Sequence, residues 1–252
     1  MITDAEVKQL TDDVLNKHVQ NIKPGEIPTE SFRGVTMYMW ENQHPGACNR
    51  HMIVFNNYNV IPEYCFNCFK VTIKPRNVIE HIKLMMVFDR IELPHDNTRK
   101  CIVECRENIP GTYLGLVYCV GIEEAEAVSE LIKKVVTDEI SGEIPVGIKR
   151  GCTPFDIAYP GYARVEQGKT FMDYPDEWRE YEESIDSQLS INEDFVVPQT
   201  HNVEDYTERD AQVIAAWLMY AARIGDRTYL DLTGGVVLPP LHTIDTTGTI
   251  ID

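Results

Sequence analysis

The sequence predicts an α+β protein whose centre is a split βαβ unit, a four-stranded antiparallel sheet with two helices on one face. The first supporting observation is that, between residues 63 and 152, the spacing of apolar residues alternates between the two-residue period of a strand and the 3.6-residue period of a helix. The second is the order of these changes: strand, helix, strand, strand, helix, strand. The expected organisation is this core with an added N-terminal segment and an added C-terminal segment.

Composition limits the classes of function. The 252 residues are 43% apolar and 25% charged, as in an ordinary globular protein, and the formal net charge is −17. Such a charge repels phosphate backbones and anionic lipids, so we expect neither nucleic acid nor a membrane as the main partner. Seven cysteines, with no signal peptide visible after Met1, predict reduced thiols and a cytoplasmic protein.

The N-terminal segment, residues 1–62, is expected to pack on the core. Thr3 and Glu6 form a capping-box pattern, which predicts a helix over residues 4–20. Two stretches with the character of strands follow at residues 34–40 and 52–60.

The core, residues 63–152, begins with an alternating strand over residues 69–73 and a helix with a broad apolar face over residues 78–88. Residues 101–106 and 113–120 then read as a hairpin. A helical stripe around residues 125–135 leads to a last strand at 144–149. This arrangement is the ferredoxin-like one, in which the strands lie side by side in the order four, one, three, two.

The C-terminal extension, residues 153–252, is predicted to be acidic and partly helical. Residues 173–210 contain 13 acidic and two basic residues, which suits a solvated surface or a docking surface for a basic protein partner. A helix is expected to begin at Thr207 and to end at Gly225, with Ile214, Trp217, Leu218, Ala221 and Ile224 facing inward. Because no flexible linker intervenes, we expect this extension to wrap the core.

Four cysteines fall at strand ends that the predicted topology brings to one edge of the sheet. Cys65 and Cys68 open the first strand, Cys119 closes the third, and Cys152 follows the fourth. Four thiolates suit tetrahedral Zn²⁺ or an iron–sulfur cluster of the [4Fe-4S] type. The sequence therefore predicts a metal site with Cys65, Cys68, Cys119 and Cys152 as ligands, and zinc is the favoured metal. Cys101 and Cys105 read instead as small buried residues.

Three other features are candidates for function, each with an ordinary structural explanation beside it. His44, Cys48 and His51 lie in one loop that could chelate a metal or could simply be a surface loop. Lys149 and Arg150 precede Cys152 and could lower the pKa of its thiol, or could simply be solvated bases at a strand end. The sheet face away from the helices could bind a small anionic ligand or could face solvent; its polar residues are Lys70, Thr72, Lys74, Glu104 and Arg106.

Three functions remain open at this stage. The favoured one is a metal-binding protein with structural zinc and a role in binding a partner or a small ligand. A second is an enzyme, either an iron–sulfur redox protein or a thiol enzyme that uses the same cysteines. The third is a metal-free interaction or regulatory domain. The sequence does not predict a substrate or an oligomeric state.

Overall fold

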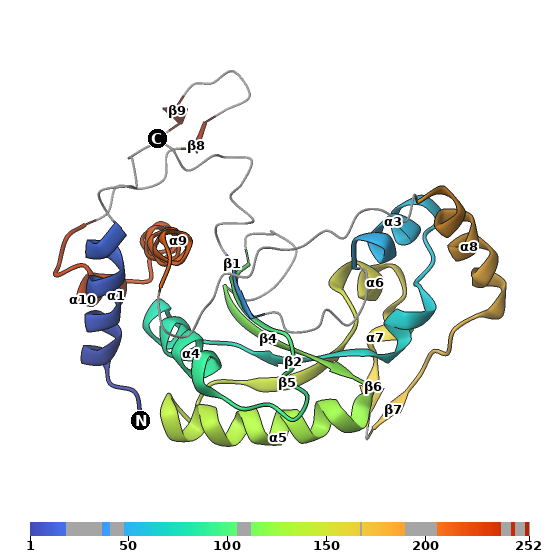
Figure 1. The fold of residues 1–252 in the computed structure, drawn as a ribbon, viewed down its shortest axis with the longest axis horizontal. Helices are drawn as coiled ribbons and strands as arrows, with labels where there is room; N and C mark the ends of the chain where they lie inside the picture. Colours follow the sequence, from blue (N-terminus) through green and yellow to red (C-terminus); the bar gives the residue numbers. More distant parts are fainter. Residues whose placement is uncertain are drawn as a thin grey trace.

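The structure is a computed structural model that describes residues 1–18, 37–40, 48–104, 112–166, 168–189, 206–237, 243–244 and 250–251. Its centre is an antiparallel sheet in the strand order β1-β3-β4-β2-β5 (Figure 1). The strands are β1 (Met37–Trp40), β2 (Cys68–Ile73), β3 (Arg99–Val103), β4 (Tyr113–Val120) and β5 (Val146–Arg150). The predicted α+β class is confirmed.

Two helices cover one face of the sheet. They are α4 (Val78–Arg90) and α5 (Ile122–Glu139), close to the predicted ranges. Phe69, Val71 and Ile73 alternate along β2 and join the buried residues of both helices in the main hydrophobic core. Cys68, Lys70 and Thr72 therefore lie on the opposite face of β2.

The N-terminal segment agrees with the prediction in one place and differs in another. The described part of the strand predicted at residues 34–40 is present as β1, and it pairs with β3, so the described sheet has five strands rather than the four of the predicted core. The strand predicted at residues 52–60 is wrong, because residues 48–58 form helix α3 (Cys48–Tyr58). His51 and Val54, three residues apart, are the buried positions of α3, and a short apolar stretch of this kind fits either period.

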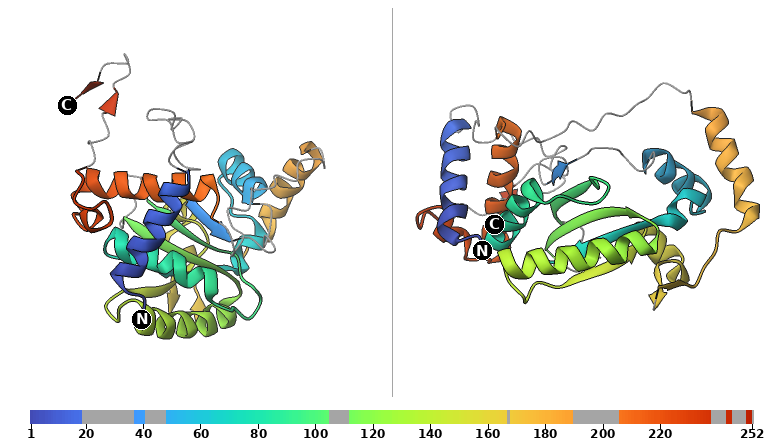
Figure 2. Two further views of the ribbon diagram at one scale, coloured as in Figure 1. Left: turned by 60° about the vertical axis from the view of Figure 1, so that its left-hand side comes forward. Right: turned by 60° about the horizontal axis from the view of Figure 1, so that its bottom comes forward.

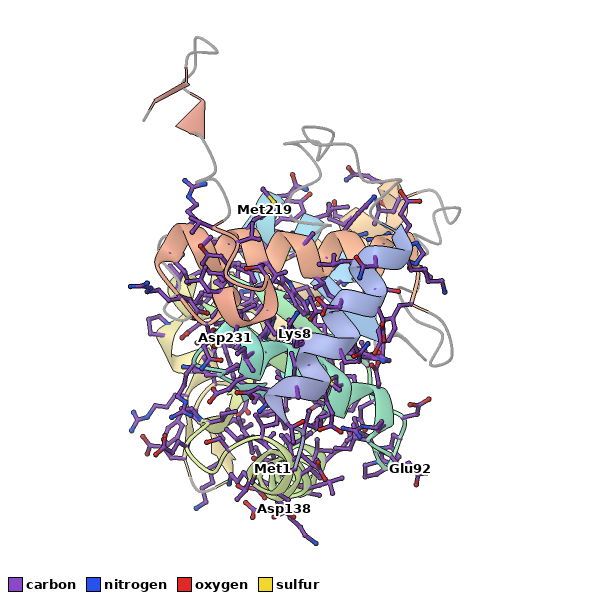
Figure 3. The ribbon with its side chains drawn as sticks, turned by 90° about the vertical axis from the view of Figure 1, so that its left-hand side faces the viewer. Met1, Lys8, Glu92, Asp138, Met219 and Asp231 are labelled. Carbon is purple, nitrogen blue, oxygen red and sulfur yellow. The ribbon has the colours of Figure 1, made fainter. Side chains whose placement is uncertain are left out.

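Helices from both terminal segments of the chain lie together at one end of the sheet. Helix α1 (Asp4–His18) contacts α4, α9 (Glu208–Ile224) and the short α10 (Tyr229–Leu232), and Figure 3 looks onto α1 and α9. The predicted caps are confirmed: Glu6 accepts from the backbone N–H of Thr3, Thr207 forms a capping box with Asp210, and Gly225 ends α9 in the left-handed conformation. Ile224 is the exception among the residues predicted to face inward, since its side chain is exposed.

A second group of short elements packs at the other end of the sheet, as Figures 1 and 2 show. Its helix α8 packs on α3, and the ring of Phe66 lies at the centre of its aromatic residues. The group comprises α3, the 3₁₀ helices η2 (Glu63–Asn67) and η3 (Asp176–Trp178), the helices α6 (Thr153–Ala158), α7 (Pro160–Ala163) and α8 (Arg179–Gln188), and the strand pair β6 (Val165–Glu166) and β7 (Lys169–Thr170).

Near the C-terminus, β8 (Thr243–Ile244) pairs antiparallel with β9 (Ile250–Ile251). Within the ranges that the structure describes, no helix has both the length and the apolar character that a bilayer crossing requires.

Candidate thiol site

The four cysteines predicted to bind metal are divided between two hydrophobic clusters. Cys119 lies directly opposite Phe69 in the β2–β4 ladder and joins Phe69 in the main core beneath the helices. Cys65 in η2 and Cys152 at the start of α6 belong instead to the aromatic cluster around Phe66. Cys68 opens β2 and is half-buried.

The predicted metal site gains no support from this arrangement. No three or more His, Cys, Asp or Glu side chains among the described residues are placed so that they could hold a metal ion. The ligand set of Cys65, Cys68, Cys119 and Cys152, with zinc or an iron–sulfur cluster, stays a prediction.

Part of the predicted chelating loop, residues 44–51, lies close to these thiols. Cys48 begins α3, and its charge acts on the pKa values of both Cys65 and Cys68. His51 is buried, and its ring stacks on Tyr64 with 5.4 Å between the ring centroids. His44 lies outside the described residues. The predicted loop is therefore wrong over residues 48–51, which begin α3, and this helix contributes a further thiol to the region. The chelating role of His44, Cys48 and His51 stays a prediction.

A polar contact joins Lys70 to Cys152. The Nζ of Lys70 lies 3.1 Å from the Sγ of Cys152 and donates to the carbonyl oxygen of Gly151 at 3.0 Å. It also lies 5.0 Å from the centre of the Tyr118 ring. Lys70 is only 6% exposed, so the sheet face away from the helices is covered at this point rather than open to solvent.

The electrostatics favour a charged pair. Burial alone would raise the pKa of the Cys152 thiol, but the charge and hydrogen bond of Lys70 outweigh it, with help from Lys100 and Lys149, and lower that pKa. Burial would likewise lower the pKa of Lys70, yet Tyr118, Cys152 and Cys68 together raise it.

The pKa values of the neighbouring thiols shift upward, in the opposite direction to that of Cys152. Burial raises the pKa of Cys68 to about 11, although Lys70 opposes that shift. Burial raises the pKa of Cys65 further. The site therefore places Cys152, whose pKa is lowered, beside two thiols whose pKa values are raised.

A sharp turn after β5 brings Cys152 to Lys70. Phe69 lies opposite Arg150, Lys70 lies opposite Lys149, and the N–H of Gly151 donates to the carbonyl of Cys68 at 2.8 Å. Gly151 then takes a positive φ of 59° beneath the ring of Tyr162, where a Cβ would lie 2.1 Å from the Tyr162 hydroxyl oxygen. Only glycine combines that conformation with that close approach.

Arg150 fixes the surroundings of this turn. Its guanidinium is buried and donates to the carbonyl oxygens of Phe66, Tyr162 and Met172 at 2.8–3.2 Å. Its Cζ also lies 4.9 Å from the centroids of both the Phe66 and Tyr162 rings. Arg150 therefore ties η2, α7 and the segment at residue 172 to the end of β5.

The cation that contacts Cys152 is not one of those predicted from the sequence. Lys149 donates to the hydroxyl of Thr153 at 2.9 Å and acts on Cys152 only through its charge, while Arg150 binds carbonyls. The sequence pattern places Lys70 only on the sheet face away from the helices. The sequence signal for this role is a lysine between the apolar residues Phe69 and Val71, on the strand that pairs with β5. Cys152 follows β5 directly after the turn at Gly151.

Of the other residues predicted on that face, Glu104 is buried, Thr72 is half-buried and Lys74 is exposed. Arg106 lies outside the described residues. Comparison with protein-family models, curated proteins and solved structures finds no match to this chain.

Proposed function

We propose that this is a thiol-dependent protein in which Cys152 is the reactive thiolate and Lys70 is the cation that stabilises it. The observation that carries the proposal is the 3.1 Å contact between Lys70 Nζ and Cys152 Sγ, made by a lysine that is almost fully buried. Of the functions open from the sequence, this contact favours the thiol enzyme.

The energetics of Lys70 support the proposal. A buried ammonium is costly unless an opposite charge and hydrogen bonds compensate for lost hydration. In the part of the chain that the structure describes, no carboxylate forms an ion pair with Lys70, whose hydrogen-bond partners are a carbonyl and a thiol. Ionisation of Cys152 supplies the missing negative charge.

The chemistry follows from the ionisation state. A thiolate attacks electrophiles such as peroxides, disulfides and activated carbonyls, whereas a protonated thiol does not. An ordinary cysteine with a pKa of about 8.5 is mostly protonated at neutral pH. Cys152 is half-buried rather than sealed in the core, so a small reagent can reach it.

The test is the pH dependence of alkylation. Wild-type protein reacts with iodoacetamide across a pH series, and mass spectrometry of peptides gives the rate at each cysteine. Cys152 is expected to be the fastest cysteine at neutral pH, with a midpoint below about 8.5. Lys70→Met should raise that midpoint by a unit or more, because it removes both the charge and the hydrogen bond.

Lys149→Met is the matched control, since it removes a lysine whose side chain binds Thr153 rather than the thiol. Its midpoint should move much less. Circular dichroism must show that Lys70→Met is folded. Equal alkylation midpoints in the wild type and the two variants would contradict the proposal.

Metal analysis separates this function from the one favoured by the sequence. Stoichiometric zinc or iron in the purified protein, lost in both Cys65→Ser and Cys119→Ser, would favour a metal-binding protein instead. The thiolate function predicts rapid Cys152 alkylation that a chelator does not change.

The finer description of the fold belongs to the same proposal. We propose that β2, α4, β3, β4, α5 and β5 form a ferredoxin-like split βαβ unit, which is supported by their lateral order β5-β2-β4-β3 and by two helices on one face. A cytoplasmic location suits a function that needs free thiols. A basic partner or a small anionic ligand remains a prediction.

A further inference from the structure

We propose that Cys68 is the resolving thiol for Cys152, so that a hydroperoxide oxidises the site to a Cys68–Cys152 disulfide. This inference rests on the proposed function, because it requires Cys152 to react first. It adds an oxidant class and a second residue to that site.

The position of Cys68 comes from the strand register. The backbone N–H of Gly151 donates to the carbonyl of Cys68, so Cys68 lies across the ladder from the residue that immediately precedes Cys152. Residues that are paired across antiparallel strands have Cα atoms about 4.5–5.5 Å apart. A disulfide joins Cα atoms that are about 4.4–6.8 Å apart. Cys152 is one residue beyond the position that pairs with Cys68.

The faces also agree. Cys68 and Lys70 are two residues apart on β2 and so project from the same face, and Lys70 Nζ contacts the Sγ of Cys152 on that face. Cys119 lies opposite Phe69 and joins the core beneath the helices. The register therefore selects Cys68 over Cys119.

The position of Lys70 suits this sequence of events. Its ammonium contacts the sulfur of Cys152, so Cys152 is the thiol that reacts with the oxidant first and Cys68 is the thiol that follows. Lys70 lies beside the attacking sulfur and can stabilise the alkoxide or hydroxide that leaves from the peroxide.

The chemistry balances in two steps. The Cys152 thiolate attacks one oxygen of the hydroperoxide, the O–O bond breaks, and the leaving oxygen takes a proton to give an alcohol or water, so Cys152 becomes a sulfenic acid. The Cys68 thiol then gives up its proton and attacks the Cys152 sulfur as a thiolate, the S–O bond breaks, and the departing hydroxide takes a proton and leaves as water. Two thiols have lost two electrons, which have reduced one hydroperoxide.

The experiment treats the reduced full-length protein with one equivalent of hydrogen peroxide, blocks the remaining thiols and maps non-reduced peptides by mass spectrometry. The expected product is an intramolecular disulfide between the peptides that contain Cys68 and Cys152. Cys68→Ser should instead stop at a sulfenic acid on Cys152, which dimedone traps. Cys152→Ser should leave Cys68 reduced.

Cys119→Ser is the matched control, because it removes a nearby thiol from the other face and should leave the Cys68–Cys152 disulfide unchanged. A Cys152 disulfide to Cys48, Cys65 or a second chain, or Cys152 oxidised beyond sulfenic acid without a disulfide, would overturn the inference.

The alkylation experiment keeps the two proposals distinct. If Cys152 alkylates rapidly and depends on Lys70, but peroxide yields no Cys68–Cys152 disulfide, the resolving role fails and the thiolate function stands. If Cys152 alkylates no faster than the other cysteines, both proposals fail.

Discussion

At the scale of single residues, Gly151 determines whether the thiol site can form. Its positive φ reverses the chain between β5 and α6, and its missing Cβ leaves room for Tyr162, whose hydroxyl donates to the carbonyl of Cys65 at 2.6 Å. Gly151 thus sets how closely the end of β5, α7 and η2 approach one another.

Gly151→Ala should therefore destabilise the protein by at least about 2 kcal/mol, since a left-handed L-residue alone costs about 1–2 kcal/mol and the clash with Tyr162 adds to it. Urea denaturation measures this change. Gly161→Ala, in α7, introduces a methyl group with no atom within 4 Å and should leave stability nearly unchanged. Similar losses in the two variants would contradict this account of Gly151.

Asp89 is a second residue whose surroundings control its ionisation. Burial raises its pKa to about 7, although hydrogen bonds from Tyr206 and Trp40 and the charge of Arg99 oppose the shift, and Asp210 adds to it. Between about pH 4 and about pH 7, Asp89 is therefore protonated in the folded state. In the unfolded state, where an aspartate has a pKa of about 3.9, it is ionised over the same range.

This residue should make stability depend on pH. A raised folded-state pKa contributes stability that is complete below about pH 4 and is lost as the pH rises through about 7. Unfolding free energies at about pH 5 and about pH 8 should differ less in Asp89→Asn than in the wild type, by a few kcal/mol. An identical pH dependence in the two proteins would show that Asp89 is not the group responsible.

At the scale of elements, side-chain caps explain why α4 and α9 begin where they do. Asn77 caps α4 by accepting from the N–H of Glu80, and Thr207 caps α9 by accepting from the N–H of Asp210 while Asp210 accepts from Thr207. These motifs are local in sequence, so α9 begins beside its cap although its apolar face packs on α1 and α4.

Thr207→Ala should cost about 1 kcal/mol through the lost cap, and should lower Tm by roughly 2–4 °C for a chain of this size. Differential scanning calorimetry measures the shift. Thr137→Ala makes the same chemical change at an exposed position inside α5, where alanine favours the helix, and should not lower Tm. A cap role for Thr207 would be wrong if both variants behaved alike.

At the scale of the whole molecule, the N- and C-terminal segments are joined by charge as well as by apolar packing. Arg50 of α3 donates to Asp186 of α8 at 2.7 and 2.8 Å and also pairs with Glu182. Glu182 in turn accepts from the backbone N–H of Glu63 and from the Tyr174 hydroxyl. Part of the acidic stretch therefore holds the protein together, and its role in binding a basic partner stays a prediction.

Arg50→Met should loosen α8 selectively. The loss of charged hydrogen bonds of about 2 kcal/mol predicts roughly thirtyfold faster amide exchange in residues 179–188, with little change in α9. Lys133→Met, which removes an exposed pair with Glu130 on α5, is the control and should change neither helix. Uniform exchange changes across the protein would contradict a local role for Arg50.

The sequence by itself determined the features that depend on neighbours along the chain. The change between apolar periods located α4, α5 and the strands from β2 to β5. Capping patterns located the start of α1 and both ends of α9. The stretch at residues 52–60 shows the limit of this reasoning, because a few apolar residues fit both periods and contacts with η2 and α8 favoured the helix.

Only the tertiary structure decided which chemical groups meet. Bringing strand ends to one edge does not say which face each side chain takes, and in a strand a single position moves a side chain to the other face. By that rule Cys119 and Cys68 lie on opposite faces of the sheet. Lys70 contacts Cys152, although the two lie far apart in the sequence. Near neighbours in the sequence encode the helices and strands. The contact between Lys70 and Cys152 instead depends on the register between β2 and β5 and on the turn at Gly151, which form only when distant strands pair.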